Sequence, residues 1–255
     1  MDNASSPEEA KIWVHRLKQF LGISYDRSQP STRSYITSVF PEPVQAALLF
    51  LPTSYLSLPP LYDLVEGFAT DLNFSSPGNV FPISDESALQ IYASRVAGTV
   101  AESCIELVYH HSSTLTSEKS RQEIIQAGGH MGVALQYINI ARDIAVDARI
   151  GRVYLPTNWL KDKGLTPSDV VKYPEGAKVE ALRQRLLDAA MEIYHEAKGA
   201  IDRLPLEARG PMRVAVESYI EIGRMLRTPG YKVKAGRATV PTFRRVMVAW
   251  KAMTG

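Results

Sequence analysis

The sequence has 255 residues, of which 45% are hydrophobic and 22% are charged, and its formal net charge is +2. This composition is typical of a globular protein with a sizeable core, so it excludes a disordered chain and indicates no nucleic-acid partner. Because no apolar run reaches the roughly 18 residues of a membrane span and no signal-peptide pattern is present, we expect an intracellular protein, soluble or peripheral to a membrane.

Helical periodicity dominates the sequence, and neither an alternating strand pattern nor an Asn-Gly hairpin signal occurs, so we expect an all-α fold. The first helix should begin at Pro7, with Ser6 as its N-cap, and end near Gly22. The next helical regions are expected at about 31–50 and 55–73, both interrupted by prolines.

A Ser-, Pro- and Gly-rich loop at 74–84 precedes a long helix that we expect at about 84–111. Later helices are expected at about 117–147, from Thr166, and at about 176–203, 208–227 and 239–253. No linker divides these regions, so we expect a single domain over residues 1–255.

Cys104 is the only cysteine, so no disulfide bond can form within the chain, and a reducing compartment is indicated. It lies in an apolar helical stretch, where we expect an inert core residue.

A stripe of short polar side chains marks the helix expected at 117–147. Gln136, Asn139, Asp143 and Asp147 are spaced 3, 4 and 4 residues apart and fall within an arc of roughly 80°, with Gly132 on the same side. Two carboxylates one turn apart can hold Mg²⁺, which takes one or two protein carboxylates together with phosphate oxygens and waters. A solvated helix face would show a similar spacing, and both interpretations are open on the pattern alone.

The segment around this stripe, GVALQYINIARDIAVDARIGRVYLP at 132–156, resembles the second aspartate-rich motif of the squalene/phytoene synthase family. The resemblance implies an isoprenoid synthase helical bundle around a central cavity. It implies that Asp143 and Asp147 are catalytic and bind Mg²⁺, or Mn²⁺ in its place, with the substrate diphosphate. It also implies that Gln136 and Asn139 line the same pocket, with Asn139 near the metal.

The same resemblance places Arg142, Arg152 and Tyr154 around the mouth of the site as substrate-binding residues. Arginine suits diphosphate because its planar guanidinium can contact two oxygens at once. Each of the three has an alternative role as a surface residue near a helix end, and Arg142 points away from the aspartate stripe on a helical projection.

A second segment, IYASRVAGTVAE at 91–102, resembles the family's Tyr-x-x-x-Val-Ala-Gly-x-Val-Gly helix. The resemblance makes Tyr92 a catalytic candidate that orients the diphosphate or shields a carbocation, and Val96 a substrate-binding residue. Core packing is the alternative for both. We expect Tyr92, Val96, Gln136 and Asn139 to line one pocket. The segment GFATDL at 67–72 also resembles the family, and we interpret it as structural.

The C-terminal region is basic, because Arg224 to Lys251 includes eight Lys and Arg residues and no acid. A solvated face explains this pattern, and so does contact with an anionic substrate or a membrane surface. The stretch at 234–250 resembles the C-terminal end of fungal-type phytoene synthases. That resemblance implies carotenoid biosynthesis, association or fusion with a lycopene cyclase domain, and no NADPH site.

The family's first aspartate-rich motif would precede the segment that begins this sequence, with Asp2 as its last aspartate. We therefore expect a cavity open on one side and little synthase activity in the isolated chain. The expected function is head-to-head condensation of two geranylgeranyl diphosphates to phytoene through a cyclopropyl diphosphate, releasing diphosphate. The alternatives are a squalene synthase-type farnesyl transferase and a non-catalytic assembly or partner protein of the same fold.

Overall fold

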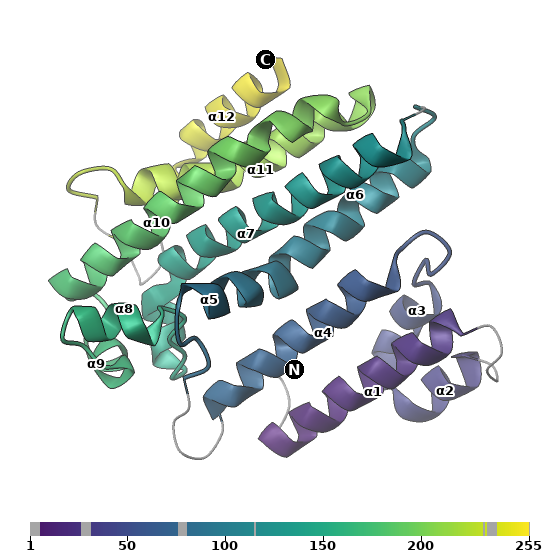
Figure 1. Ribbon diagram of the computed structural model, residues 1–255, viewed down its shortest axis with the longest axis horizontal. Helices are drawn as coiled ribbons and strands as arrows, with labels where there is room; N and C mark the ends of the chain where they lie inside the picture. The colour runs from purple at the N-terminus through teal and green to yellow at the C-terminus, as the bar shows by residue number, and fades with distance from the viewer. Residues whose placement is uncertain are drawn as a thin grey trace.

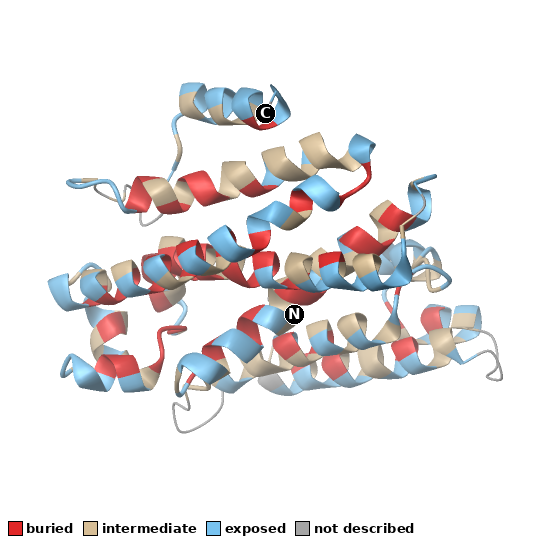
Figure 2. Ribbon diagram, turned by 45° about the horizontal axis from the view of Figure 1, so that its top comes forward, coloured by how far each residue is buried: buried red, intermediate tan, exposed pale blue. Residues whose placement is uncertain are grey.

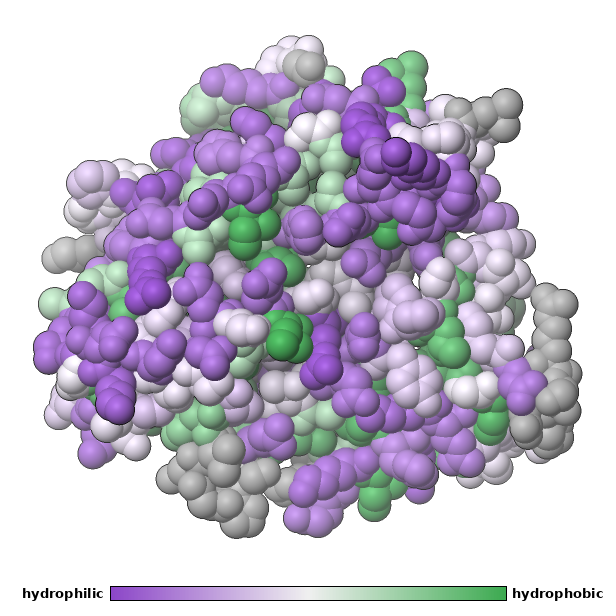
Figure 3. Space-filling model, viewed as in Figure 1, coloured by the Kyte–Doolittle hydropathy of each residue, from purple (hydrophilic) through white to green (hydrophobic). Residues whose placement is uncertain are grey.

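The computed structural model describes residues 6–26, 32–75, 81–114, 116–231, 233 and 239–254. Within these residues every regular element is a helix, which confirms the all-α prediction (Figure 1). The prediction for Asp2 concerns a position outside the described residues. On the face shown in Figure 3, hydrophilic residues predominate and apolar residues form separate patches.

The N-terminal helices form a layer with its own hydrophobic cluster. The layer consists of α1 (Pro7–Tyr25), α2 (Thr32–Val39), α3 (Glu42–Leu49) and α4 (Leu58–Leu72), followed by the short η1 (Asn73–Ser75). Ser6 caps α1 as predicted, because its side chain accepts a hydrogen bond of 3.1 Å from the Glu9 amide. Phe20, Ile36 and Val65 are buried between these helices.

The helix expected at 84–111 is not continuous. It consists of α5 (Glu86–Ala93), a π-helical turn η2 (Ser94–Gly98) and α6 (Thr99–His111). A π-turn adds about one residue to the helix, so residues before and after it are rotated by about 100° relative to a straight α-helix. The faces predicted for a continuous helix therefore do not hold across η2.

The long helix α7 (Glu118–Arg149) runs through the middle of the molecule (Figure 1) and carries fourteen buried residues. It packs against η2 and α6 and against two helices from the C-terminal part, α10 (Ala177–Ala197) and α11 (Leu206–Leu226). Buried residues concentrate along these contacts (Figure 2).

Small residues allow η2 and α7 to approach closely, as the sequence predicted. A Cβ atom at Gly132 would lie 2.4 Å from the carbonyl oxygen of Ala97, and one at Gly98 would lie 3.1 Å from that of Gly129. Both contacts are with backbone atoms, which cannot move aside as a flexible side chain can.

The chain reverses sharply after α7. Gly151 has φ +75°, its amide donates to the Ala148 carbonyl at 3.0 Å, and the Arg152 amide donates to the Asp147 carbonyl at 2.9 Å. These two bonds form a Schellman motif, in which glycine is favoured because of its positive φ. The turn brings Arg152 and Tyr154 back towards the aspartate end of α7.

The remaining helices cover this end and the opposite edge. They are α8 (Thr157–Asp162), α9 (Pro167–Lys172), η3 (Lys198–Arg203) and α12 (Thr242–Thr254). The sequence indicated no helix at α8, which follows Pro156 and buries Trp159 and Leu160. Among the helices of the described ranges, none combines the length and apolarity needed to cross a membrane.

Candidate active site

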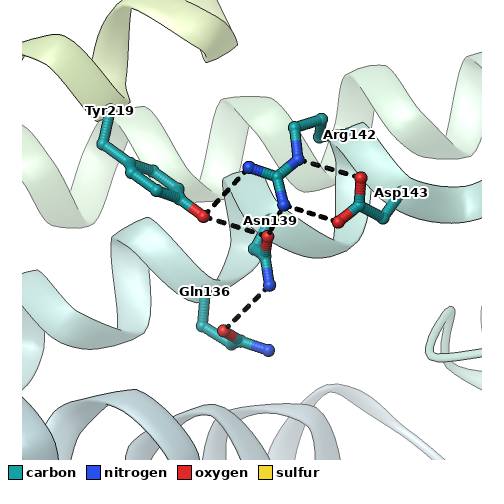
Figure 4. A network of polar contacts seen from close by, with 5 residues as sticks. All are labelled: Gln136, Asn139, Arg142, Asp143 and Tyr219. Atoms are coloured by element: carbon teal, nitrogen blue, oxygen red, sulfur yellow. Dashed lines mark hydrogen bonds and ion pairs between the residues drawn. The ribbon is translucent and has the colours of Figure 1, made fainter. Parts of the chain in front are cut away.

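The polar stripe of α7 forms a hydrogen-bonded network (Figure 4). Asn139 donates to Gln136 at 3.5 Å and accepts a short hydrogen bond from Arg142. Arg142 binds both carboxylate oxygens of Asp143, with N–O distances of 2.9 and 2.6 Å. Three residues of the predicted stripe, Gln136, Asn139 and Asp143, are therefore connected through hydrogen bonds, and Arg142 folds back onto them.

Tyr219 of α11 joins this network from across the bundle. Its hydroxyl accepts a hydrogen bond of 3.2 Å from Arg142 and donates one of 3.0 Å to Asn139. The guanidinium carbon of Arg142 also lies 5.6 Å from the centroid of the Tyr219 ring, within reach of a cation–π interaction. Tyr219 is thus a site residue that the sequence reading missed.

Asp147 lies one turn beyond Asp143, close to two other carboxylates. Its pKa is raised to about 7, chiefly by burial and also by the negative charges of Asp143 and Asp71, while the positive charges of Arg152 and Arg142 oppose the rise. A cation placed beside Asp147 would relieve this repulsion. This end of α7 is therefore electrostatically suited to a bound cation.

Asp71, at the end of α4, supplies the third carboxylate. Tyr154 donates a hydrogen bond of 3.0 Å to Asp71 Oδ1, and Arg152 Nη1 lies 3.9 Å from Asp71 Oδ2. The segment 67–72, interpreted as structural, therefore also places a charged group beside the predicted site residues Arg152 and Tyr154.

Tyr92 of α5 is packed into the same end of the site. It is buried, and its ring stacks on that of Tyr154 with 5.1 Å between centroids and 23° between planes. Burial is the main cause that raises the pKa of the Tyr92 hydroxyl, with the charge of Asp71 as the next contribution. Tyr92 therefore keeps its proton over the whole physiological pH range.

An apolar cavity of about 420 Å³ lies between η2, α6, α7, η3 and α11. Val96, Gly132, Leu135 and Tyr219 are among the residues that line it. Val100, also in the lining, is 43% exposed, so the cavity opens towards solvent along α6.

Of the four residues expected to line one pocket, one belongs to the lining of this cavity. Val96 lines this cavity, whereas Tyr92, Gln136 and Asn139 do not belong to its lining. Tyr92 packs instead on Tyr154, away from this cavity. Asn139 is bonded to Tyr219, whose side chain lines the cavity instead.

Cys104 corrects a second expectation. It is exposed and lines the cavity, so it is not a buried core residue. Its helix α6 is apolar on the side that faces the cavity, and an apolar pattern alone does not distinguish a cavity wall from a filled core.

The carboxylates of this site fit a magnesium ion that is also bound by a phosphate ligand. Within the described part of the chain, no group of three or more His, Cys, Asp or Glu side chains is arranged to hold a metal ion. Mg²⁺ commonly uses one or two carboxylates and completes its shell with waters and phosphate oxygens. Asp143 and Asp147 match that need, although both oxygens of Asp143 are bonded to Arg142 in this arrangement.

The sequence model of the family described as squalene/phytoene synthase matches residues 1–244 of this chain. A bifunctional lycopene cyclase/phytoene synthase from Gibberella fujikuroi is 52% identical over 257 residues, which cover 99% of this chain and 44% of that protein. A protein of the same name from Phaeosphaeria nodorum is 52% identical over 256 residues, which cover 99% of this chain and 43% of that protein. The chain thus spans less than half the length of these relatives.

Two solved structures share the fold. A dehydrosqualene synthase in complex with ligand has a TM-score of 0.67 at 20% identity, covering 96% of this chain and 86% of that chain. The squalene synthase HpnC from Alicyclobacillus acidocaldarius has a TM-score of 0.61 at 17% identity, covering 91% of this chain and 87% of that chain. With the matched motifs on α5–α6 and α7, these findings show that the chain belongs to the squalene/phytoene synthase family.

Proposed function

We propose that this chain is the phytoene synthase part of a carotenoid-forming protein. It would join two geranylgeranyl diphosphates head to head through a cyclopropyl diphosphate and release diphosphate. The relatives at 52% identity carry phytoene synthase in their names, which supports this choice within the family.

The observation that carries the proposal is that Tyr219 contacts both the apolar cavity and the polar stripe. Its side chain lines the apolar cavity, while its hydroxyl bonds Asn139 and Arg142 of the polar stripe. A prenyl diphosphate has the same division into a long apolar chain and a charged head. The arrangement suits a ligand whose chain occupies the cavity and whose diphosphate lies against the stripe.

The polar residues have distinct proposed roles. Arg142 and Arg152 would bind diphosphate oxygens, helped by Gln136 and Asn139. Mg²⁺, or Mn²⁺ in its place, would be held by Asp143 and Asp147 near Asn139 and would neutralise charge on the leaving diphosphate when bound.

The aromatic pair Tyr92 and Tyr154 would act at the same end of the site. Tyr154 is held by Asp71 and stacks on Tyr92, so both hydroxyls are fixed beside the carboxylates. Fixed O–H groups can bind the departing diphosphate, and the ring faces can stabilise nearby positive charge. Val96 would contact the prenyl chain, because it lines the cavity.

We also propose two partners beyond the substrate. The relatives' names join phytoene synthase to lycopene cyclase, which supports association with a lycopene cyclase domain. The exposed cations Arg245 and Lys251 of the C-terminal region support peripheral contact with an intracellular membrane, where such apolar products would accumulate.

The test is conversion of labelled geranylgeranyl diphosphate, and separately of labelled farnesyl diphosphate, in the presence of Mg²⁺. It uses the 255-residue chain and a version extended upstream through its coding sequence to include a first aspartate-rich motif. Phytoene from the first substrate supports the proposal. Squalene-type product from the second alone would favour a farnesyl transferase, and no product from either well-folded protein would favour the non-catalytic partner.

A further inference from the structure

Helix α12 lies at the outer edge of the molecule (Figure 1), and it exposes a stripe of large apolar residues. The exposed fractions are 80% for Phe243, 63% for Val246, 71% for Trp250 and 58% for Met253, and Met247 is 39% exposed. At 100° per residue these five positions fall within an arc of about 120°. They form one continuous face, which we call the outer face of α12.

The opposite side of α12 is already used for packing on α11. Ala252 is buried, and its carbonyl accepts a hydrogen bond of 3.3 Å from Arg213. Arg244 bonds the buried carboxylate of Glu221, which also accepts a hydrogen bond of 3.1 Å from Arg224. These bonds fix the rotation of α12, so its outer face is held towards the surroundings.

The same bonds change the interpretation of the basic C-terminal region. Arg224 pairs with Glu217 and Glu221, Arg227 pairs with Asp188, and Arg244 pairs with Glu221. These charges are largely neutralised within the protein. The sequence pattern therefore overstated the basic charge available for an external contact.

Two exposed cations, Arg245 and Lys251, remain on α12, and the helix contains no acidic residue. A second copy of the chain fits poorly here, because the outer face of α12 is too small for a stable two-fold interface. Thirteen residues form a helix about 20 Å long and about 10 Å wide, whose outer face offers on the order of 200 Å². A stable protein interface buries about 800 Å² per partner.

A lipid surface matches these features better. Helices that lie in a bilayer interface combine an apolar face containing Trp, Phe or Leu with flanking Lys or Arg. Trp250 and Phe243 supply the aromatic groups, and Lys251 flanks the stripe. We propose that the outer face of α12 lies in the interface of an anionic membrane and holds the protein there. This inference deepens the proposed membrane contact and is independent of the proposed catalysis.

The experiment measures flotation with lipid vesicles made of phosphatidylcholine alone or mixed with phosphatidylserine. It compares the unmodified chain with the triple variant Phe243→Gln/Val246→Gln/Trp250→Gln. The variant should lose at least about tenfold in partition to mixed vesicles, because it removes most of the apolar area that enters the lipid. Brominated lipids should quench Trp250 fluorescence, and the quenching should decrease in Trp250→Phe.

A matched control changes three equally exposed apolar residues elsewhere, Phe50→Gln/Tyr173→Gln/Leu206→Gln, which are 83%, 69% and 76% exposed. This control should float like the unmodified chain. The pair Arg245→Gln/Lys251→Gln should reduce only the preference for phosphatidylserine.

Equal flotation of the α12 variant and the unmodified chain would overturn the proposal, as would no flotation of the unmodified chain. Self-association in size exclusion that the α12 variant abolishes, without flotation, would assign the face to a second copy instead. Because no step measures turnover, these outcomes stay separate from a failure of the synthase assay.

Discussion

The hydroxyl of Tyr154 donates a hydrogen bond of 3.0 Å to Asp71, a residue 83 positions earlier in the chain. This contact joins the end of α4 to the turn that follows α7. It places a carboxylate near Asp147 and fixes a tyrosine that stacks on Tyr92. Asp71 therefore affects both the shape and the charge of the candidate site.

Replacing Asp71 should affect two measurable quantities. Asp71→Ala removes the acceptor of the buried Tyr154 hydroxyl and should lower the free energy of unfolding by about 1–3 kcal/mol. Asp71→Asn keeps an acceptor oxygen and should cost less, but it removes a negative charge, so the pKa of Asp147 should fall below about 7. Urea denaturation and carboxyl NMR titration measure the two effects. Asp63→Asn, at an exposed position of the same helix, is the control and should change neither.

The contact between Gly132 and Ala97 predicts a steric limit. A Cβ atom at Gly132 would lie 2.4 Å from a backbone oxygen, so Gly132→Ala should force α7 and η2 apart and cost about 1–3 kcal/mol. Thermal unfolding measures the loss. Gly22→Ala is the control, because a Cβ there meets nothing within 4 Å, and a helical alanine should stabilise the protein by up to about 1 kcal/mol. Equal effects of the two changes would contradict the close contact.

Asp147 should make the stability of the unliganded protein depend on pH. Its pKa is about 7 in the fold and about 3.9 in an unfolded chain, so the unfolded state loses its proton first as pH rises. Protonated Asp147 therefore adds to the free energy of unfolding. This contribution is complete below about pH 4 and is lost as the pH rises through about 7. Asp147→Asn, which is neutral at every pH, should therefore raise the free energy of unfolding by about 2–4 kcal/mol near about pH 8 and change it little near about pH 4.

Urea denaturation at the two pH values tests this prediction. Asp162→Asn, at an exposed position at the end of α8, should show no such difference. A destabilised Asp147→Asn protein at the higher pH would mean that the carboxylate is favourably paired in the fold.

Tyr219→Phe should weaken binding of the ligand's diphosphate head but not binding of its apolar chain. The ring remains in the cavity wall, but the bonds to Arg142 and Asn139 disappear. Affinity for inorganic diphosphate with Mg²⁺ should fall by about 10- to 100-fold, as expected for a lost hydrogen bond to a charged group. Calorimetric titration measures this, with geranylgeraniol as the control ligand whose affinity should not change. If affinity for geranylgeraniol fell while affinity for diphosphate stayed the same, Tyr219 would contribute to the cavity wall only.

The parts of the fold that depend on nearby residues were predictable from the sequence. The helix at 117–147 was expected within two residues of α7 at each end, because its apolar periodicity and its cap at Ser117 are local. The close approach at Gly132 was also expected from the small residues. Three site features were not predictable, because they depend on contacts between distant segments. Asp71 and Tyr219 reach the site from helices 83 and 80 residues away from Tyr154 and Asn139, and the π-turn η2 interrupts the helix expected at 84–111 where it packs on α7.

The central claim is that the Asp143 and Asp147 stripe of α7 binds a prenyl diphosphate together with Mg²⁺. Its most direct test is titration with a non-hydrolysable geranylgeranyl diphosphate analogue, with and without Mg²⁺, using the unmodified chain and Asp143→Asn/Asp147→Asn. The account predicts that Mg²⁺ strengthens binding to the unmodified chain, and that the double variant binds at least about tenfold more weakly and no longer responds to the metal. Equal affinity of the two proteins with Mg²⁺ present would contradict the claim.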